Sequence, residues 1–308
     1  MIDTKEITSV LPLTIKETLQ CLNNIEKLQE IRVKVNKPLI FIANDMEIIS
    51  SYKACAEDLK IIIQRISNYS IYAFEDEIKQ GYITIKGGHR VGLCGKCIIE
   101  NDTVKTIKNI SSINIRICKE VIGCSDRLIP YIIKKAEVLN TIIISPPKCG
   151  KTTLLRDISR NLSEGSELSC IKGKKVCIID ERSEIAACFE GIPQMNVGLR
   201  TDVLDGCIKS EGIMMAIRSM SPEVVVCDEI GTQKDMDSII AALNCGISLV
   251  TSIHGIGIED LYQRAVFDAL IENQVFKRAI VLSNLNGVCT IEYVYDFHSK
   301  EAIWRRSK

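Results

Sequence analysis

The second half of the chain contains four short runs of apolar, largely β-branched residues that alternate with stretches of helical periodicity. The runs are TIIIS (141–145), KVCIID (175–180), EVVVCDE (223–229) and ISLVTSI (247–253). The helical stretches are GKTTLLRDISRNL (150–162), IKSEGIMMAIRSM (208–220) and KDMDSIIAALNC (234–245). Strands that are apolar on both faces are typical of a parallel sheet covered by helices. The pattern therefore predicts an α/β fold with a doubly wound core.

The first part of the chain predicts a smaller α+β domain. Helical periodicity occurs over 14–25 and 56–67, and strand-like runs occur over 30–35 and 38–43. The stretch 81–100 predicts two strands that are joined by a turn at Gly87-Gly88.

These patterns divide the chain into three parts. We expect an N-terminal α+β domain over 1–116, a linking helix over 117–138 and the core over 139–308. The core is expected to end in a β-hairpin that turns at Asn286-Gly287.

Charge and hydropathy limit the class of protein. Lysine and arginine together number 39, as do aspartate and glutamate, so a strong overall positive charge does not drive binding to partners. No apolar run is long enough for a transmembrane helix, and the start MIDTKEITSV lacks the apolar segment of a secretory signal. We therefore expect a cytoplasmic location.

The 14 cysteines are scattered, many of them within apolar runs, where a thiol behaves as a small buried hydrophobe. This usage predicts a reducing compartment. Cys94 and Cys97 form a CxxC pair, which is either half of a zinc site or two cysteines of a turn or strand. The absence of a second such pair favours the turn or strand.

The segment SPPKCGKTT (145–153) begins at the last residue of the first apolar run and leads into a helical stretch. A phosphate-binding loop needs a delivering strand, inward-pointing backbone amides, a lysine for the phosphates and a hydroxyl for Mg²⁺ at the start of the helix. Gly150, Lys151 and Thr152 have the required spacing, and Ser145 takes the place of the first glycine. Serine is small enough for that turn unless the position needs a positive φ.

The loop therefore predicts a site for the phosphates of a nucleotide, formed by Ser145, Pro146, Pro147, Lys148, Cys149, Gly150, Lys151, Thr152 and Thr153. The alternative is a coincidental Gly-Lys-Thr before a helix.

An acidic pair, Asp228 and Glu229, follows the third apolar run. In a nucleotide hydrolase, such an aspartate holds Mg²⁺ through water, and the glutamate polarises the attacking water. The alternative is an acidic pair that merely ends a strand. Together with the loop, the pair predicts ATP and Mg²⁺ as cofactors, with Thr152 and Asp228 at the metal.

Two further runs end in residues that suit the same edge of the sheet, where open α/β sheets bind ligands. One ends in Asp180, Glu181, Arg182 and Glu184, and the other in His254. His254 is a candidate sensor of the γ-phosphate or a histidine that only ends a strand.

Three arginines are candidates to face phosphate, namely Arg182, Arg200 and Arg218. One of them could act as an arginine finger, within the chain or towards a neighbouring subunit. Taken alone, each of them is more typical of a surface or salt-bridge residue.

The order SPPKCGKTTLLRDISR, IIDERSEIA, IRSMSPEVVVCDEIG and LVTSIHG resembles the Walker A, aspartate, Walker B and histidine boxes of type II and type IV secretion ATPases. The resemblance is strongest to the stage III sporulation protein AA family of endospore-forming bacteria, whose phosphate loop also commonly begins with serine and two prolines. Segments such as EIRVKVNKPL and AIVLSNLNGVCTIEYVYD extend it over nearly the whole chain.

The resemblance implies a RecA-like P-loop NTPase core with a smaller N-terminal α+β domain. It implies an ATPase that is peripheral at the mother-cell side of the membrane and supports a channel or secretion complex between mother cell and forespore. The implied partners are further copies in a homo-oligomer, expected to be a hexameric ring, and membrane-embedded proteins of the same sporulation operon.

By this resemblance, Lys151 and Thr152 are expected to bind phosphate and Mg²⁺. Glu229 matches the Walker B acid, and His254 matches the histidine of the histidine box. Glu181 and Glu184 match the acidic aspartate box. Secretion ATPases often have glycine in place of Asp228, which leaves open whether Glu229 or an aspartate-box glutamate activates water.

Two other functions remain open at this point. A basic turn with Lys86, His89 and Arg90 fits a nucleotide-switched nucleic-acid-binding protein. Few aromatic residues nearby and the balanced charge make a nucleic-acid partner unlikely. The third function is a structural ring component with vestigial hydrolysis.

Overall fold

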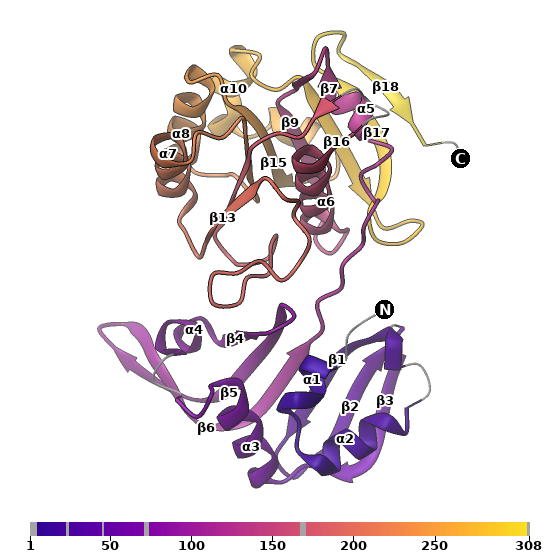
Figure 1. Cartoon of the computed structure of the whole chain (residues 1–308), viewed down its shortest axis with the longest axis vertical. Coiled ribbons are helices and arrows are strands. Elements are labelled where there is room, and N and C mark those ends of the chain that lie inside the picture. Colours follow the sequence, from indigo (N-terminus) through magenta and orange to yellow (C-terminus); the bar gives the residue numbers. More distant parts are fainter. Residues whose placement is uncertain (1–4, 23–24, 45, 71–73, 167–170, 307–308) are drawn as a thin grey trace. The chain divides into compact units, whose positions relative to one another are not determined.

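The computed structural model describes residues 5–22, 25–44, 46–70, 74–166 and 171–306. The chain divides into two compact units, which we call the N-terminal unit (Met1–Lys119) and the C-terminal unit (Glu120–Lys308). Figure 1 shows the elements of each unit. The expected helix over 14–25 includes residues 23–24, which lie outside the described residues.

The N-terminal unit contains an antiparallel sheet of six strands in the order β3-β2-β1-β6-β5-β4. The strands are β1 Leu28–Lys34, β2 Pro38–Ala43, β3 Met46–Lys53, β4 Tyr82–Ile85, β5 His89–Glu100 and β6 Thr103–Arg116. Buried and more exposed residues alternate along β2 and β4, as expected for a sheet with one covered face.

The helices of this unit are α1 Lys5–Val10, α2 Leu13–Gln20, α3 Ala56–Ile66 and α4 Glu75–Gln80, with the 3₁₀ turn Ile25–Lys27. In α3, the apolar residues Leu59, Ile62 and Ile66 share one face and join the core that the sheet residues Ile31 and Val33 also form. The predicted strands, the helix α3 and the turn at Gly87-Gly88 are confirmed. Cys94 and Cys97 both lie on β5, so they are strand cysteines.

The C-terminal unit contains a sheet of eight strands in the order β13-β12-β14-β15-β9-β16-β17-β18. It is parallel from β13 to β16, and the last two strands are antiparallel. The strands are β9 Thr141–Ser145, β12 Val176–Asp180, β13 Thr201–Asp205, β14 Val224–Cys227, β15 Ser248–His254, β16 Arg278–Ser283, β17 Thr290–Asp296 and β18 Glu301–Arg305.

Helices cover both faces of this sheet. Ile143 of β9 packs in a cluster with α6 (Lys151–Glu164), whereas its neighbours Ile142 and Ile144 pack in a second cluster with α7 (Lys209–Ser219) and α8 (Gln233–Asn244). Successive strand residues point to opposite faces, and every residue of β9 is buried because both faces of the sheet are covered. This arrangement confirms the predicted doubly wound α/β core.

The remaining helices of this unit are α5 Ile129–Ile132, α9 Glu259–Tyr262 and α10 Asp268–Glu272, with the 3₁₀ turn Ala265–Phe267. The short pairs are β7 Ile133–Lys134 with β8 Glu137–Val138 and β10 Gly165–Ser166 with β11 Ile171–Lys172. The terminal hairpin forms as predicted, since β16 pairs with β17 across Asn286-Gly287. Within the described ranges, no helix is long and apolar enough to cross a membrane.

The linking helix expected over 117–138 is wrong, because helix in this stretch is limited to the four residues of α5. Gly123 has a φ of 85°, and Lys135 and Ala136 also have positive φ, which a continuing helix does not allow. The backbone N–H groups of Gly123 and Ser125 donate instead to the carboxylate of Asp157 on α6. A long-range partner therefore replaces the local helical bonds.

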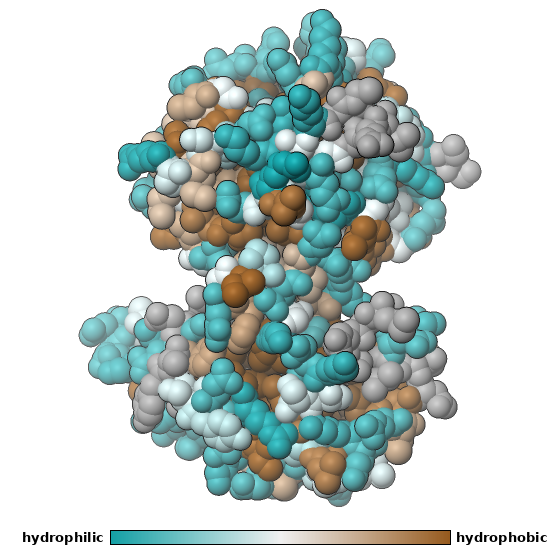
Figure 2. Space-filling view, in the orientation of Figure 1, coloured by the Kyte–Doolittle hydropathy of each residue, from teal (hydrophilic) through white to brown (hydrophobic). Residues whose placement is uncertain are grey.

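The surface shown in Figure 2 is mainly hydrophilic in both units, with scattered hydrophobic side chains. Most of the large apolar residues described above are buried in the cores of the two units.

Candidate functional site

A cleft of about 370 Å³ lies at the carboxyl ends of β9, β14 and β15. Its volume falls within the range of about 300–1,000 Å³ that is usual for small-molecule sites. Most of the predicted site residues line it, namely Pro146, Pro147, Lys148, Gly150, Lys151, Thr152, Thr153, Arg182, Glu184, Asp228, Glu229 and His254. The sheet order explains this meeting, because β15 lies between β9 and β14.

The phosphate loop begins at Ser145, which is the last residue of β9 and pairs with His254 of β15. Its backbone is therefore extended, and serine is accepted there because no positive φ is needed. The left-handed conformation occurs instead at Lys148, with a φ of 62°, and at Gly150, with a φ of 89°. A Cβ on Gly150 would lie 2.4 Å from Cys289 Sγ, so this position requires glycine.

Helix α6 begins directly after Gly150, and no side chain caps its N-terminus. The first-turn amides of a helix have no intrahelical acceptors, and the helix dipole places partial positive charge beside them. This arrangement fits an anion such as a phosphate group.

Asp228 joins the two halves of the site. Its Oδ1 atom lies 3.2 Å from Lys151 Nζ, and its Oδ2 atom accepts a hydrogen bond of 3.2 Å from Thr152 Oγ1. Lys151 is buried, so the Asp228 carboxylate balances a charge that is shielded from water. The loop and the acidic pair, 76 residues apart in sequence, therefore meet in one site.

The donor set fits Mg²⁺ bound with a nucleotide. A hydroxyl and a carboxylate are the oxygen ligands that Mg²⁺ prefers, and this ion usually takes one or two carboxylates together with phosphate oxygens. Among the described residues, no group of three or more His, Cys, Asp or Glu side chains is placed to hold a metal alone. A metal at Thr152 and Asp228 would therefore depend on ligands from the nucleotide.

Glu229 lines the cleft and has a φ of 50°. Its Oε1 atom is 3.3 Å from His254 Nε2, and its Oε2 atom accepts a hydrogen bond of 3.1 Å from Arg182. These pairs are partly exposed, so they orient the carboxylate more than they stabilise the fold. The other ring nitrogen of His254, Nδ1, is buried and has no hydrogen-bond partner among the described residues.

The aspartate box divides into a structural residue and two glutamates. Asp180 is buried, and its carboxylate accepts hydrogen bonds of 2.8 Å from the backbone N–H groups of Glu184 and Ala186. Burial raises the pKa of Asp180 to about 6 despite these bonds. Glu184 lines the cleft, whereas Glu181 forms an ion pair with Lys209 and is absent from the described lining.

The three candidate arginines have different surroundings. Arg182 lines the cleft. Arg200 donates a hydrogen bond of 2.9 Å to the carbonyl of Ser163 near the end of α6, and Arg218 is exposed in the last turn of α7. Of the three, Arg182 is the one that the chain places at its own cleft.

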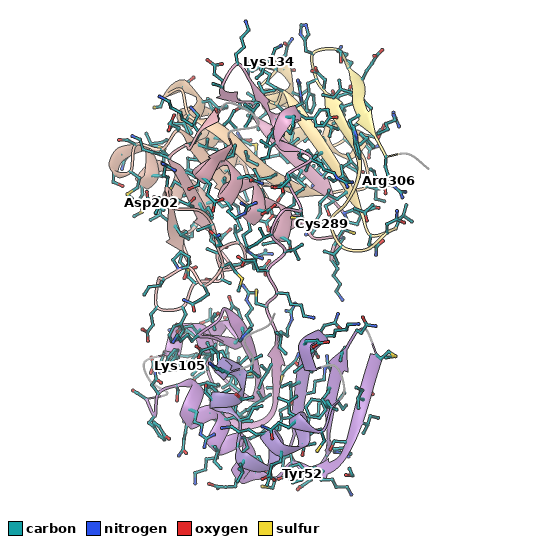
Figure 3. The ribbon with its side chains drawn as sticks, turned by 45° about the vertical axis from the view of Figure 1, so that its right-hand side comes forward. Tyr52, Lys105, Lys134, Asp202, Cys289 and Arg306 are labelled. Atoms are coloured by element: carbon teal, nitrogen blue, oxygen red, sulfur yellow. The ribbon has the colours of Figure 1, made fainter. Side chains whose placement is uncertain are left out.

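The sequence analysis missed two contributors to the site. Val288 lines the cleft, and Cys289 donates a hydrogen bond of 3.2 Å from Sγ to the carbonyl of Gly150. Figure 3 labels Cys289 in the loop between β16 and β17. No motif signals these residues, because their position arises from the parallel pairing of β16 with β9.

The analysis also missed Ser252 of β15, which is buried beside the acidic pair. Its Oγ atom hydrogen-bonds the Asp228 carboxylate and the backbone N–H of Glu229. The position of Ser252, two residues before His254, is its sole sequence signal.

The basic turn of the N-terminal unit is engaged within that unit. Lys86 lies 3.3 Å from a carboxylate oxygen of Glu6, and Arg90 lies over the ring of Tyr82. His89 is buried, its Nδ1 atom accepts from the backbone N–H of Cys118, and burial lowers its pKa. Lys86 and Arg90 therefore have partners within their own unit, and burial disfavours the charged form of His89.

The chain is similar in sequence to one protein family and to a named relative from that family. Residues 2–302 match the family described as "Sporulation stage III, protein AA". The chain is 45% identical over 293 residues to the stage III sporulation protein AA of Bacillus subtilis (strain 168), and the match covers 94% of each chain.

Two solved structures show the same fold. The ATPase DotB of Legionella pneumophila has a TM-score of 0.59 and 15% identity, over 92% of this chain and 79% of that one. The pilus retraction motor PilT with bound ADP has a TM-score of 0.56 and 12% identity, over 87% and 76% of the two chains. The fold is thus a P-loop NTPase core with a smaller N-terminal domain, as predicted. Since the family match extends over nearly its whole length, the chain belongs to the sporulation stage III protein AA family.

Proposed function

We propose that this chain hydrolyses ATP in the cleft between the phosphate loop and the acidic pair. One observation carries the proposal: the carboxylate of Asp228 lies within 3.2 Å of both Lys151 Nζ and Thr152 Oγ1. A lysine, a hydroxyl and an acid that meet at the N-terminus of a helix are the groups that bind a nucleotide phosphate with Mg²⁺.

Each residue then has a chemical role. Lys151 neutralises the phosphates, while Thr152 and Asp228 would hold Mg²⁺. Bound Mg²⁺ would neutralise charge that develops on the phosphate oxygens. Glu229 accepts the proton of the attacking water at its carboxylate, and His254 and Arg182 fix the direction of that carboxylate.

Glu184 is the second candidate for the base, because it shares the cleft with Glu229. Glu181 is a weaker candidate, since its carboxylate is paired with Lys209.

We further propose that the ATPase acts as a homo-oligomeric ring, of six subunits by family resemblance, on the mother-cell side of the membrane. Membrane-embedded proteins of the same sporulation operon would be its partners in a channel complex between mother cell and forespore. Membership of the sporulation family supports this role. Mass measurement in solution, with and without Mg-nucleotide and on wild type and Glu229→Gln, tests the ring.

The first prediction concerns Lys151→Ala, which removes the positive charge at the phosphates. We expect ATP turnover to be lost and Mg-ATP binding to weaken strongly, as measured by phosphate release and calorimetry. Lys174→Ala is the matched control, because Lys174 pairs with Glu223 on the surface, outside the cleft lining. Failure of the folded wild-type protein to bind Mg-ATP would refute the proposed function. Turnover is measured with and without the membrane partners, because the ATPase could depend on them.

A further inference from the structure

Ser252 makes three hydrogen bonds to three consecutive residues at the tip of β14. Its Oγ atom donates to Asp228 Oδ1 and accepts from the backbone N–H of Glu229 at 3.0 Å. Its carbonyl accepts from the backbone N–H of Ile230 at 3.1 Å. One residue therefore holds the side chain of Asp228 and the backbone of the next two residues.

The hydroxyl of Ser252 has a fixed orientation. A serine hydroxyl has one proton to donate, and here that proton is directed at Asp228 while a lone pair faces the Glu229 N–H group. The side chain is fully buried on β15, so its hydroxyl exchanges these two bonds for none with solvent.

The backbone of Glu229 depends on this support. Its φ of 50° lies in the left-handed region, which residues other than glycine adopt rarely because the Cβ atom then crowds the backbone. Such a conformation persists when the surroundings determine it. Ser252 accepts hydrogen bonds from the backbone N–H groups of Glu229 and Ile230. These bonds hold the backbone of Glu229 and therefore favour the observed direction of the Glu229 side chain.

Ser252 differs from the other donors to Asp228. Lys151 and Thr152 also contact this carboxylate, but both line the cleft and are the groups proposed to bind phosphate and Mg²⁺. Ser252 is absent from the described lining of the cleft. Its bond to Asp228 therefore does not compete with a nucleotide.

We propose that Ser252 is a positioning residue for ATP hydrolysis, which orients the Asp228 carboxylate towards the metal and the Glu229 carboxylate towards the attacking water. The inference rests on the proposed function of the same cleft. It assigns to β15 a role in catalysis through Ser252 that is separate from that of His254.

The test compares Ser252→Ala with Thr251→Val. Thr251 is the neighbouring residue on β15 and is equally buried, but its hydroxyl contacts the thiol of Cys227 at 3.4 Å rather than the acidic pair. Both variants remove one buried hydroxyl from the same strand, and urea unfolding of each establishes that it still folds. A difference in catalysis is then due to the contacts of Ser252.

For Ser252→Ala we expect kcat to fall by about 10- to 100-fold, because small misplacements of reacting groups have effects of this size. We expect the Mg²⁺ concentration for half-maximal binding of ATP to rise several-fold. The affinity for ATP in EDTA should stay within about twofold of wild type, because the phosphate loop is unchanged. Thr251→Val should match wild type in all three measurements.

Two results would overturn the inference. One is that Ser252→Ala and Thr251→Val have the same kcat and the same Mg²⁺ dependence. The other is that Ser252→Ala loses as much ATP affinity in EDTA as it does in Mg²⁺. If wild type binds Mg-ATP without hydrolysing it, the proposed function fails by itself. The Mg²⁺ concentration for half-maximal ATP binding still tests the role of Ser252 in that case. If this concentration is the same in Ser252→Ala as in wild type, the positioning role is refuted.

Discussion

Gly150 lies where the phosphate loop, the first turn of α6 and the loop before β17 meet. Its φ is 89°, and a Cβ there would approach Val288 and Cys289 within 2.6 Å. The position therefore excludes a side chain for two reasons, conformation and space.

For Gly150→Ala we expect a loss of stability of more than about 2 kcal/mol, since overpacking adds to the cost of a left-handed alanine. ATP affinity should also fall at least tenfold, by about 1.4 kcal/mol or more. Gly246→Ala is the matched control, because Gly246 has a φ of 77° but no atom within 4 Å of the added Cβ. Urea unfolding and calorimetry measure both effects; equal losses in the two variants would show that the contacts with Val288 and Cys289 are unimportant.

At the same scale, the sequence predicted the residues whose spacing is local. Gly150, Lys151 and Thr152 form a motif, and the Asp228-Glu229 pair directly follows an apolar run. Ser252 and Cys289 could not be predicted in this way, because their contacts arise from strand pairing between distant segments. Glu181 was included by its place in a motif, and its pairing with Lys209 is likewise invisible in sequence.

Among the elements, α6 links the phosphate loop to the segment that begins the C-terminal unit. Its residue Asp157 is buried and accepts hydrogen bonds from the backbone and hydroxyl of Ser125, from Gly123 and from Arg160. Burial alone would raise the pKa of Asp157, but these hydrogen bonds outweigh it and lower the pKa. The ionised carboxylate therefore anchors the turn at 123–128 to the helix.

A pH-dependent stability follows from this shift. Because the pKa of Asp157 is lower in the folded state, its contribution is present above the unfolded value of about 4 and is lost as the pH falls through the folded value. We expect Asp157→Asn to reduce the free energy of unfolding by about 1–3 kcal/mol at pH 7 and by less in acid. Urea unfolding across this range measures the difference, with the exposed Asp237→Asn as control. A loss that does not change with pH would contradict the ionised anchor.

The elements predicted from sequence are those whose own residues decide the structure. Continuous β-branched runs specify buried parallel strands, and β9, β12, β14 and β15 form as expected. The edge strand β3 was missed, since exposed polar residues interrupt its apolar pattern. A linking helix was predicted over 117–138, but the Asp157 carboxylate accepts hydrogen bonds from the backbone of Gly123 and Ser125 instead.

For the molecule as a whole, the two units have separate cores and the cleft belongs to one of them. The described hydrophobic clusters each lie within a single unit, and all the residues that line the cleft lie between 146 and 288. A fragment over 120–308 should therefore fold and bind Mg-ATP with an affinity within about threefold of the full chain, or about 0.7 kcal/mol. Circular dichroism establishes folding, and calorimetry measures binding, with the fragment over 1–119 as the control that should fold without binding. If the fragment over 120–308 folds but fails to bind where the full chain does, the N-terminal unit contributes to the nucleotide site, and the cleft described within one unit is incomplete.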